Sequence, residues 1–424
     1  MRYTPAVMRL RSSNGAGAPR ELAWLSLAMF LGMTLWFSAT AATAPLVAEF
    51  RLTPGDAAWL TMAVQGGFVA GTLASALITL PDLINPRRLF ALGCAAGAAA
   101  NASLVFVSGA AALIALRVVT GVALACVYPP GMKIAAGWFE RRRGAALGIL
   151  IGALTIGSAF PHLLASVGAT IPWRTLMLTA SALALGGSVV VLLLVHDGPY
   201  VATSARFDPR AAAQVFAERG TRLATLGYLG HMWELYAMWT WIAAFATASL
   251  LPAARGVAAP ASRAGSAISF ITIGSGALGS AAAGWWADAI GKARIARWAL
   301  MTSGVCAAVS GVVYGAPPVV LALFAAVWGV AVVADSAQLS ALVAQFSPRD
   351  HVGTALTIQT CLGFLLTMAS IRLVPVFAHV VGWQWTFLLL VPGPLLGALA
   401  LTTLDDRPMA GLKTCPSTAA DLSS

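Results

Sequence analysis

The stretch that decides the fold is Gly284-Trp-Trp-Ala-Asp288-Ala-Ile-Gly291-Lys292. It places an acid, a glycine and a base together at the end of a long apolar segment. A second cluster of this kind, Asp82 followed by Arg87 and Arg88, ends an earlier apolar segment. The two acids lie 206 positions apart, which suggests that the chain contains an internal repeat.

Two further matches support the repeat. Gly144, in the run Arg-Gly-Ala-Ala-Leu, corresponds to Gly353, in Val-Gly-Thr-Ala-Leu, 209 positions later. Trp173 corresponds to Trp383 at an offset of 210. Three matches near one offset are hard to obtain by chance. A duplicated helical unit is typical of proteins in which one half rocks against the other and exposes a central site alternately to each side of a membrane.

Composition points to a protein that crosses the membrane many times. Of 424 residues, 59% are hydrophobic and only 10% are charged, which is too little charge for a soluble domain. Twelve apolar segments can be counted, each long enough to span a hydrocarbon core about 30 Å thick. They are 22–48, 57–80, 89–109, 111–136, 144–168, 173–195, 223–250, 264–290, 293–314, 317–343, 352–378 and 383–404. The first is longer than the apolar core of a cleaved signal peptide, so we expect it to remain in the protein.

The segments fall into two sets of six. The only polar interval of any length between them runs from 196 to 222 and is typical of a cytoplasmic linker. We therefore expect an N-terminal tail (1–20), a first bundle (21–195), the linker (196–222), a second bundle (223–404) and a C-terminal tail (405–424).

Lys and Arg indicate the orientation. With the N-terminus inside, nineteen of them fall on the cytoplasmic side and four on the opposite loops. Cytoplasmic loops of membrane proteins carry this excess. We expect both termini in the cytoplasm of a cell with a bacterial-type inner (plasma) membrane. The net charge of +11 then reflects topology, and we expect no nucleic-acid partner.

Two motifs resemble those of the major facilitator superfamily. The stretch 284–292 is similar to its loop signature Gly-x-x-x-Asp-(Arg/Lys)-x-Gly-(Arg/Lys), with Ala289 in place of the usual base. Arg117-Val-Val-Thr-Gly121 resembles its fourth-helix Arg-x-x-x-Gly element, and the likeness extends over about 22–404. The first-half loop departs from the signature, because it has one residue too many between acid and base and Pro86 where glycine is expected. The resemblance implies an all-α fold of twelve transmembrane helices in two pseudo-symmetric six-helix bundles, with helices one, four, seven and ten around a central cavity.

The richest polar stretch inside an apolar segment is 227–241. Five of its residues, at helical spacing, share one face: Tyr228, His231, Glu234, Met238 and Trp241. Ionisable residues at bilayer depth are costly unless they face protein or water, and they usually mark a functional path. We expect this face to line an aqueous cavity.

Four ionisable residues are candidates for proton coupling. Glu234 is the first choice, since a carboxyl group in a wet cavity can take up and release protons, and His231 one turn away could share that role or form a structural pair with it. Arg117 always carries its charge, and the resemblance implies a role in proton coupling; a buried pair bracing its helix is the alternative. Asp335 is the fourth, and it could instead neutralise Arg372 on the next segment.

Other residues are candidates for contact with the solute or for control of conformation. For substrate binding we consider Trp36, Ser38, Gln65, Tyr228, Met238, Trp241 and Arg372. For a latch between the two halves we consider Asp82, Arg87, Arg88, Gly284, Asp288, Gly291 and Lys292, with simple anchoring at the cytoplasmic surface as the alternative. The glycine-rich helix faces are interpreted as close helix contacts, because no phosphate-binding Gly-Lys-Ser/Thr follows them.

These patterns predict a secondary active transporter that moves a small organic solute or anion by alternating access, coupled to protons. A drug or metabolite efflux antiporter is the alternative, and a non-transporting polytopic sensor or enzyme is the alternative from another class. An enzyme would need a cluster of nucleophilic or metal-binding residues, which the sequence lacks. We therefore expect no enzymatic activity, metal or cofactor, and as partners only a small-molecule substrate, protons and the lipid bilayer around a monomer.

Overall fold

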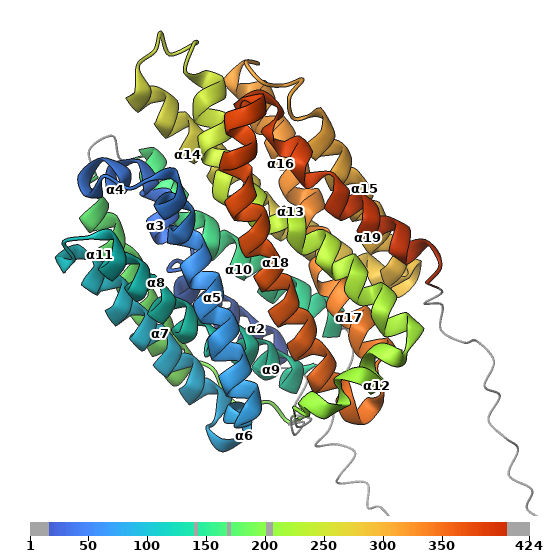
Figure 1. Ribbon diagram of the computed structural model, residues 1–424. Helices are drawn as coiled ribbons and strands as arrows, with labels where there is room; N and C mark the ends of the chain where they lie inside the picture. The colour runs from blue at the N-terminus through green and yellow to red at the C-terminus, as the bar shows by residue number, and fades with distance from the viewer. Residues whose placement is uncertain (1–16, 140–142, 168–170, 201–206, 405–424) are drawn as a thin grey trace, which may run out of the picture.

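The computed structural model describes residues 17–139, 143–167, 171–200 and 207–404, and this part of the chain is helical with no strand (Figure 1). The predicted tails lie almost wholly outside the described residues. The helices form two groups side by side, one before and one after the linker.

The first group contains the helices up to residue 193. They are α2 (Ala18–Met33), α3 (Ser38–Ala41), α4 (Thr43–Phe50), α5 (Pro54–Leu77), α6 (Leu80–Leu83), α7 (Pro86–Ser103), η2 (Leu104–Phe106), α8 (Ala110–Ala125), α9 (Tyr128–Trp138), α10 (Arg143–Val167) and α11 (Trp173–Leu193).

The linker and the second group follow. The linker contains η3 (Pro209–Ala211) and α12 (Ala212–Ala217). The second group is α13 (Arg219–Leu250), α14 (Ala258–Ile290), α15 (Lys292–Val309), α16 (Pro318–Ala334), α17 (Ser336–Phe346), η4 (Arg349–His351), α18 (Val352–Val381), η5 (Trp383–Leu390) and α19 (Pro392–Thr402).

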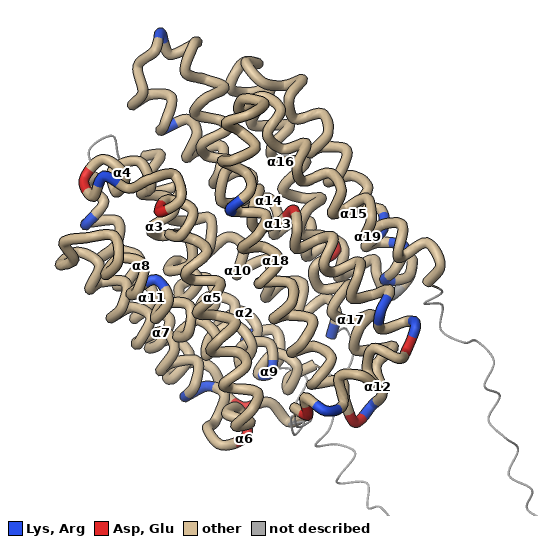
Figure 2. The backbone as a smooth tube through the Cα atoms, viewed as in Figure 1, with Lys and Arg blue, Asp and Glu red and all other residues tan. Residues whose placement is uncertain are grey.

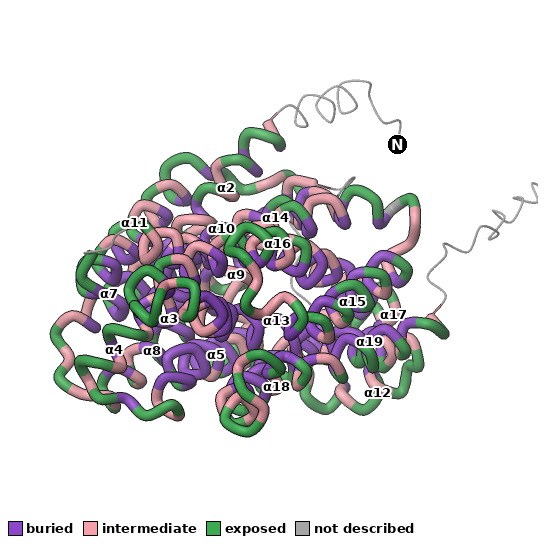
Figure 3. The backbone as a smooth tube through the Cα atoms, turned by 90° about the horizontal axis from the view of Figure 1, so that it is seen from above, coloured by how far each residue is buried: buried purple, intermediate pink, exposed green. Residues whose placement is uncertain are grey.

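All twelve predicted segments are helical, but nine helical stretches of the described chain are long and apolar enough to cross a bilayer by length and composition alone. The other three are the predicted segments 22–48, 223–250 and 293–314. The first is divided among α2, α3 and α4, and three of the first six residues of α15 are basic. Helix α13 carries an imidazole and a carboxyl group. It can hold these polar groups because other helices surround it and bury most of its side chains (Figure 3). The crossing of these three remains a prediction.

Three of the predicted segments are divided between successive α-helices in mid-course. The first is interrupted between Met33 and Ser38, the fourth at Cys126–Val127, and the tenth at Asp335. In the fourth, prolines follow at the start of α9, where a missing N–H and a fixed φ suit a first turn but cannot continue a preceding helix. Each break frees backbone carbonyls that need new partners.

Small residues set the packing inside each group in the same way. Gly67 on α5 lies so close to Val118 on α8 that a Cβ would overlap the valine carbonyl oxygen, and Gly279 on α14 meets Val330 on α16 identically. Both members of the second contact lie 212 positions after their counterparts. The predicted repeat is therefore present in the packing of the helices, as expected for close small-residue contacts.

The two groups also meet each other. Helix α10 packs against α14, and α5 packs against α18. A Cβ at Gly148 would lie 2.7 Å from the carbonyl oxygen of Ser280, whose hydroxyl donates to the carbonyl of Gly148 at 3.0 Å. Charged residues gather at the two ends of the molecule, with few in between (Figure 2). The outer surface carries exposed Leu, Val and Trp, which suits a lipid environment.

Candidate functional site

A cavity of about 1290 Å³ lies between the two groups of helices. Thr72 on α5 and Tyr128 on α9 line one wall, and Ser340 on α17 and Thr357 on α18 line the other. The lining includes the connecting segments at the end of the molecule where α6 and α12 lie (Figure 1). The cavity thus runs from that end towards the middle of the bundle.

Beyond the cavity, six rings from both groups pack together and form what we term the central aromatic cluster: Trp36, Phe37, Phe68, Tyr236, Trp239 and Phe364. The Trp36 ring centroid is 5.7 Å from both Tyr236 and Phe364, and those of Phe68 and Phe364 are 4.7 Å apart. Tyr128 in the cavity wall stacks on Phe68 at 6.4 Å. The cluster therefore lies next to the inner end of the cavity.

Five ring pairs of the cluster join one group of helices to the other. Each such pair contributes about 0.5–1.5 kcal/mol beyond the area it buries. Their sum is a few kcal/mol, which is the size of the gap between interconverting conformations of one protein. One hydrogen bond also crosses here, from Thr367 Oγ1 to Gln65 Oε1 at 2.6 Å. The cluster therefore joins the two groups of helices next to the inner end of the cavity.

Arg117 lies inside the first group and is fully buried. Its guanidinium donates to the carbonyl oxygens of Leu35 (3.0 Å), Leu60 (3.1 Å) and Trp36, and to Ser38 Oγ (3.3 Å) and Asn101 Oδ1 (3.5 Å). All five acceptors are neutral. The break between α2 and α3 exposes two of these carbonyls, so Arg117 completes the hydrogen bonding of the broken segment and places Trp36. The predicted candidate Ser38 belongs to this network.

His231 and Asp335 form a buried pair in the second group, 2% and 1% exposed. The Nδ1 atom of His231 lies 2.8 Å from Asp335 Oδ1, and its Nε2 lies 3.0 Å from the hydroxyl of Ser336. Asp335 occupies the break between α16 and α17, and Ala337, two residues later, lines the cavity. A carboxyl–imidazole pair therefore lies close behind the cavity wall.

The alternative in which Asp335 neutralises Arg372 is not seen in this structure. Asp335 faces His231, whereas the guanidinium of Arg372 lies against Gly55 in the first turn of α5, where a Cβ would be 2.6 Å from its Nη1. Consecutive helices need not bring their polar residues to the same depth. This also places the substrate candidate Arg372 at the end of α5 that is remote from the cavity lining.

The structural pair of Glu234 with His231 is not formed either. The fully buried carboxylate of Glu234 accepts from Ser303 Oγ at 2.8 Å and from Trp328 Nε1 at 2.7 Å. Its side chain therefore points towards α15 and α16 and is held by two donors. The Trp328 N–H can only donate and favours the ionised carboxylate, whereas the Ser303 hydroxyl, which also lies 3.1 Å from the carbonyl oxygen of Leu300, can donate to a carboxylate or accept from a protonated carboxyl group.

The predicted face of α13 is buried, but it does not line the cavity in this conformation. Tyr228 packs against Gly363 on α18, and Trp241 donates from Nε1 to the carbonyl of Ile371 at 2.9 Å. Met238 is fully buried. The face turns into the second group of helices, because α13 is surrounded by α14, α17, α18 and α19.

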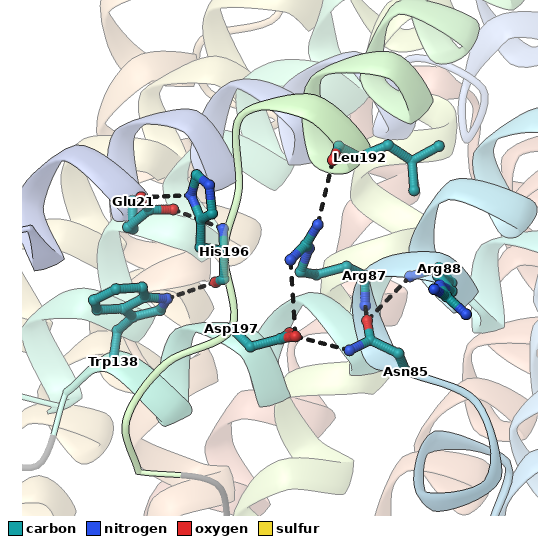
Figure 4. Close-up of polar contacts among 8 residues, drawn as sticks. All are labelled: Glu21, Asn85, Arg87, Arg88, Trp138, Leu192, His196 and Asp197. Carbon is teal, nitrogen blue, oxygen red and sulfur yellow. Dashed lines mark hydrogen bonds and ion pairs between the residues drawn. The ribbon is translucent and has the colours of Figure 1, made fainter.

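The first-half latch candidates have partners within their own group and the linker. Asp82 pairs with Lys133 at 2.5 Å. Arg87 lies 3.7 Å from Asp197 and donates to the carbonyl of Leu192 at 3.2 Å (Figure 4). The backbone N–H of Arg88 donates to Asn85 Oδ1 at 3.4 Å.

The start of the linker is fastened at several points (Figure 4). Buried Glu21 accepts from the backbone N–H of His196 at 2.8 Å and lies 3.1 Å from its ring Nδ1. Trp138 Nε1 donates to the carbonyl of His196 at 2.8 Å, and Asn85 Nδ2 donates to Asp197 Oδ2 at 2.8 Å. The linker thus leaves the first group along its surface and enters the cavity rim.

The second-half latch candidates lie where α14 ends. Gly284 meets Gly144 of α10 across the interface, where a Cβ would be 2.9 Å from the Gly144 carbonyl oxygen. Gly291 has φ 101°, a conformation that favours glycine and lets the chain turn from α14 into α15. Lys292 Nζ donates to Gln345 Oε1 at 3.2 Å. The side chain of Asp288 lies outside the described part of the structure.

Phe68 and Phe364 are residues of the site that were not singled out from the sequence. They lie in apolar segments where nothing distinguishes them from lipid-facing phenylalanines, and only helix packing brings them together. His162, an imidazole inside an apolar segment next to Pro161, is recognisable in the sequence and is most simply interpreted there as a helix-kink residue. The structure buries it beside Phe37, with ring centroids 6.2 Å apart.

A cavity between two related groups of helices in a membrane protein is the architecture of a multi-pass transporter. The family model described as Major Facilitator Superfamily matches residues 25–257, which is more than half of the chain. The chain belongs to the major facilitator superfamily and is a secondary transporter, not an enzyme.

A solved structure of a mutant of the nucleoside transporter NupG has the same fold. It matches with a TM-score of 0.67 and 16% sequence identity, over 90% of this chain and 98% of that chain. The match extends to the second group of helices, which lies largely beyond the family-model match, and thus confirms the all-helical transporter fold over both groups.

Proposed function

We propose that this protein moves a small organic solute across a bacterial-type plasma membrane by alternating access, coupled to protons. The observation that carries the proposal is the cavity between the two groups of helices, which ends at the central aromatic cluster. In this proposal 21–195 and 223–404 are two bundles joined by the linker 196–222. They rock about the close contact of α10 with α14, and the cluster parts when the cavity closes.

The orientation proposed from the Lys and Arg distribution makes the cavity end cytoplasmic, with both chain termini on that side. Lys133, Arg143 and Lys292 all line the cavity near that end, as expected for cytoplasmic loops. The structure then represents the inward-facing state. The latch candidates of the first half would change partners when the two bundles close over the cavity.

The His231–Asp335 pair is the proposed proton carrier. A carboxyl and an imidazole 2.8 Å apart share one proton readily, and burial makes the total charge of the pair sensitive to solvent access. Because the pair lies at the break of the tenth segment, rocking that opens or closes the cavity would change its exposure. Glu234 is proposed as a second proton site. Arg117 is proposed as the fixed positive charge that counters the negative charge of the ionised Glu234.

The solute is proposed from the residues of this chain. NupG is described as a nucleoside transporter, and at 16% identity the likeness concerns the fold. The cavity walls and the central aromatic cluster contain aromatic rings and neutral hydrogen-bonding groups. They are suited to a small organic solute.

The test is proton release on solute addition to purified protein in weakly buffered detergent solution. The panel contains nucleosides, organic anions, organic cations and sugars. We expect one class to change the pH, and Asp335→Asn to abolish the change while the solute still binds. Asp350→Asn, which alters an exposed carboxylate on η4, is the control and should behave like the unmodified protein. Solute binding without proton release in all three proteins would refute the coupling.

A further inference from the structure

The central aromatic cluster and His162 beside it hold polar atoms that have no hydrogen-bond partner among the described residues. They are Nε1 of Trp36, Nε1 of Trp239 and both ring nitrogens of His162. Nε2 of Gln65, beside the cluster, is a further such atom. None of these side chains is more than 2% exposed. Buried polar side chains in native proteins nearly always have partners, so four such residues at one interface need an explanation.

These atoms are mostly hydrogen-bond donors. An indole N–H and a carboxamide NH₂ can only donate, and a neutral imidazole offers one donor and one acceptor. The site is thus rich in donors and poor in acceptors. A charged group adjoins the site, because the guanidinium of Arg117 donates to the carbonyl of Trp36. A partner for these atoms must accept several hydrogen bonds and must not bring a positive charge next to Arg117.

Aromatic rings of the cluster determine the shape of the site. The planes of Phe37 and Tyr236 are nearly parallel, with an interplanar angle of 15° and centroids 6.3 Å apart. Trp36 and Tyr236 are tilted by 33° at 5.7 Å. Each of these pairs joins the two groups of helices, so each must separate when the groups rock. A flat ring entering between them would replace the lost ring contacts, because every aromatic has a π face on which another can stack.

We propose that the central aromatic cluster is the binding site of a planar heteroaromatic solute that accepts hydrogen bonds from Trp36, Trp239 and His162. This inference rests on the proposed transport function and adds the substrate class. The solute reaches the site from the cavity past Tyr128, which stacks on Phe68 at the boundary of the cluster. Sugars lack the flat face, and organic cations meet the charge of Arg117.

The test compares three probes of defined chemistry on purified protein by isothermal titration. Caffeine is planar and has hydrogen-bond acceptors but no N–H donor, indole is planar with a donor and no strong acceptor, and D-glucose is not planar. We expect caffeine to bind, indole to bind at least ten-fold more weakly and D-glucose not to bind. If the unmodified protein binds no caffeine at any concentration up to the solubility limit of caffeine, the inference is overturned.

Variants locate the site. Trp36→Phe and Trp239→Phe each keep an aromatic ring and remove one donor, so each should weaken caffeine binding about ten-fold, the effect of one lost hydrogen bond. Trp233→Phe is the matched control on α13, since its Nε1 already donates to the carbonyl of Leu389 at 3.0 Å. Unchanged caffeine affinity in both cluster variants would place the site elsewhere. If either variant fails to purify as a single species, His162→Phe takes its place; it keeps a ring, removes both ring nitrogens and should likewise weaken caffeine binding.

Counterflow in proteoliposomes separates this inference from the proposed function. Exchange of labelled caffeine supports both. Caffeine binding without exchange of any solute would refute transport and leave the binding site standing. Exchange of D-glucose or of an organic cation, without caffeine binding, would leave the transport function standing and overturn the substrate class.

Discussion

Single residues in this protein show how charge is kept inside a membrane bundle. Arg117 has five neutral acceptors and, among the described residues, no carboxylate partner. Two of the acceptors, the carbonyls of Leu35 and Trp36, belong to the break between α2 and α3. The guanidinium offers five N–H donors in a planar fork, whereas a compact ammonium group offers only three. Arg117 therefore positions the helix break as much as it supplies charge.

Arg117→Lys should destabilise the protein although the charge is retained. The substitution loses at least two charge-assisted hydrogen bonds, each contributing about 1.5–3 kcal/mol, so we expect a loss of about 3–6 kcal/mol. Unfolding by SDS in mixed micelles measures this as a lower midpoint. Arg349→Lys, an exposed residue on η4, is the control. A midpoint equal to that of the control would show that the fork geometry does not matter.

At this scale the sequence predicted which residues are buried more reliably than it predicted their partners. An ionisable residue inside an apolar segment must face protein or water, so Arg117, His231, Glu234 and Asp335 could be singled out. The partner of His231 lies 104 positions away, on a helix whose rotation and depth depend on tertiary packing. The local alternative, a structural pair of His231 with Glu234 one turn away, is not formed for this reason.

Among the helices, close approach is decided by glycine. Gly67 and Gly279 each face a carbonyl oxygen of the neighbouring helix in corresponding positions of the two groups. The reading of the glycine-rich faces as close helix contacts is confirmed at both positions. The breaks at Cys126–Val127 and at Asp335 lie in corresponding helices, yet only the first is marked by prolines. The break at Asp335 could not be predicted, because nothing local requires it.

Gly67→Ala and Gly279→Ala should each lower the unfolding midpoint. In an open helix the change would stabilise by up to about 1 kcal/mol, because alanine favours helix. Here the added methyl group would overlap backbone of the next helix, and overpacking costs about 1–3 kcal/mol. Gly109→Ala is the control, since nothing lies within 4 Å of a Cβ there. A midpoint that rises in both variants would show that the helices can move apart freely.

For the whole molecule, the repeat in the sequence predicted two related groups of helices, and the structural match to NupG covers both. The motif offsets of 206 to 210 differ slightly from the 212 seen in the packing, because the connecting segments differ in length. A central cavity was expected from the resemblance, but its lining and the ring contacts of the central aromatic cluster could not be predicted, since they depend on how the two groups tilt against each other. That tilt is also the degree of freedom that alternating access requires.

The central claim is that the two groups rock, so that one end closes when the other opens. Electron–electron double resonance with paired spin labels on a cysteine-free background measures this directly. Leu83→Cys and Asp350→Cys report on the cavity end, and Phe106→Cys and Val257→Cys report on the opposite end; all four positions are exposed.

With a transported solute and at two pH values, we expect each pair to show two distance populations. The population that shortens the cavity-end distance should grow together with the one that lengthens the distance at the opposite end. A single unchanged distance at both ends, in labelled proteins that still transport, would contradict the rocking of the two groups. Simultaneous widening at both ends would contradict it equally.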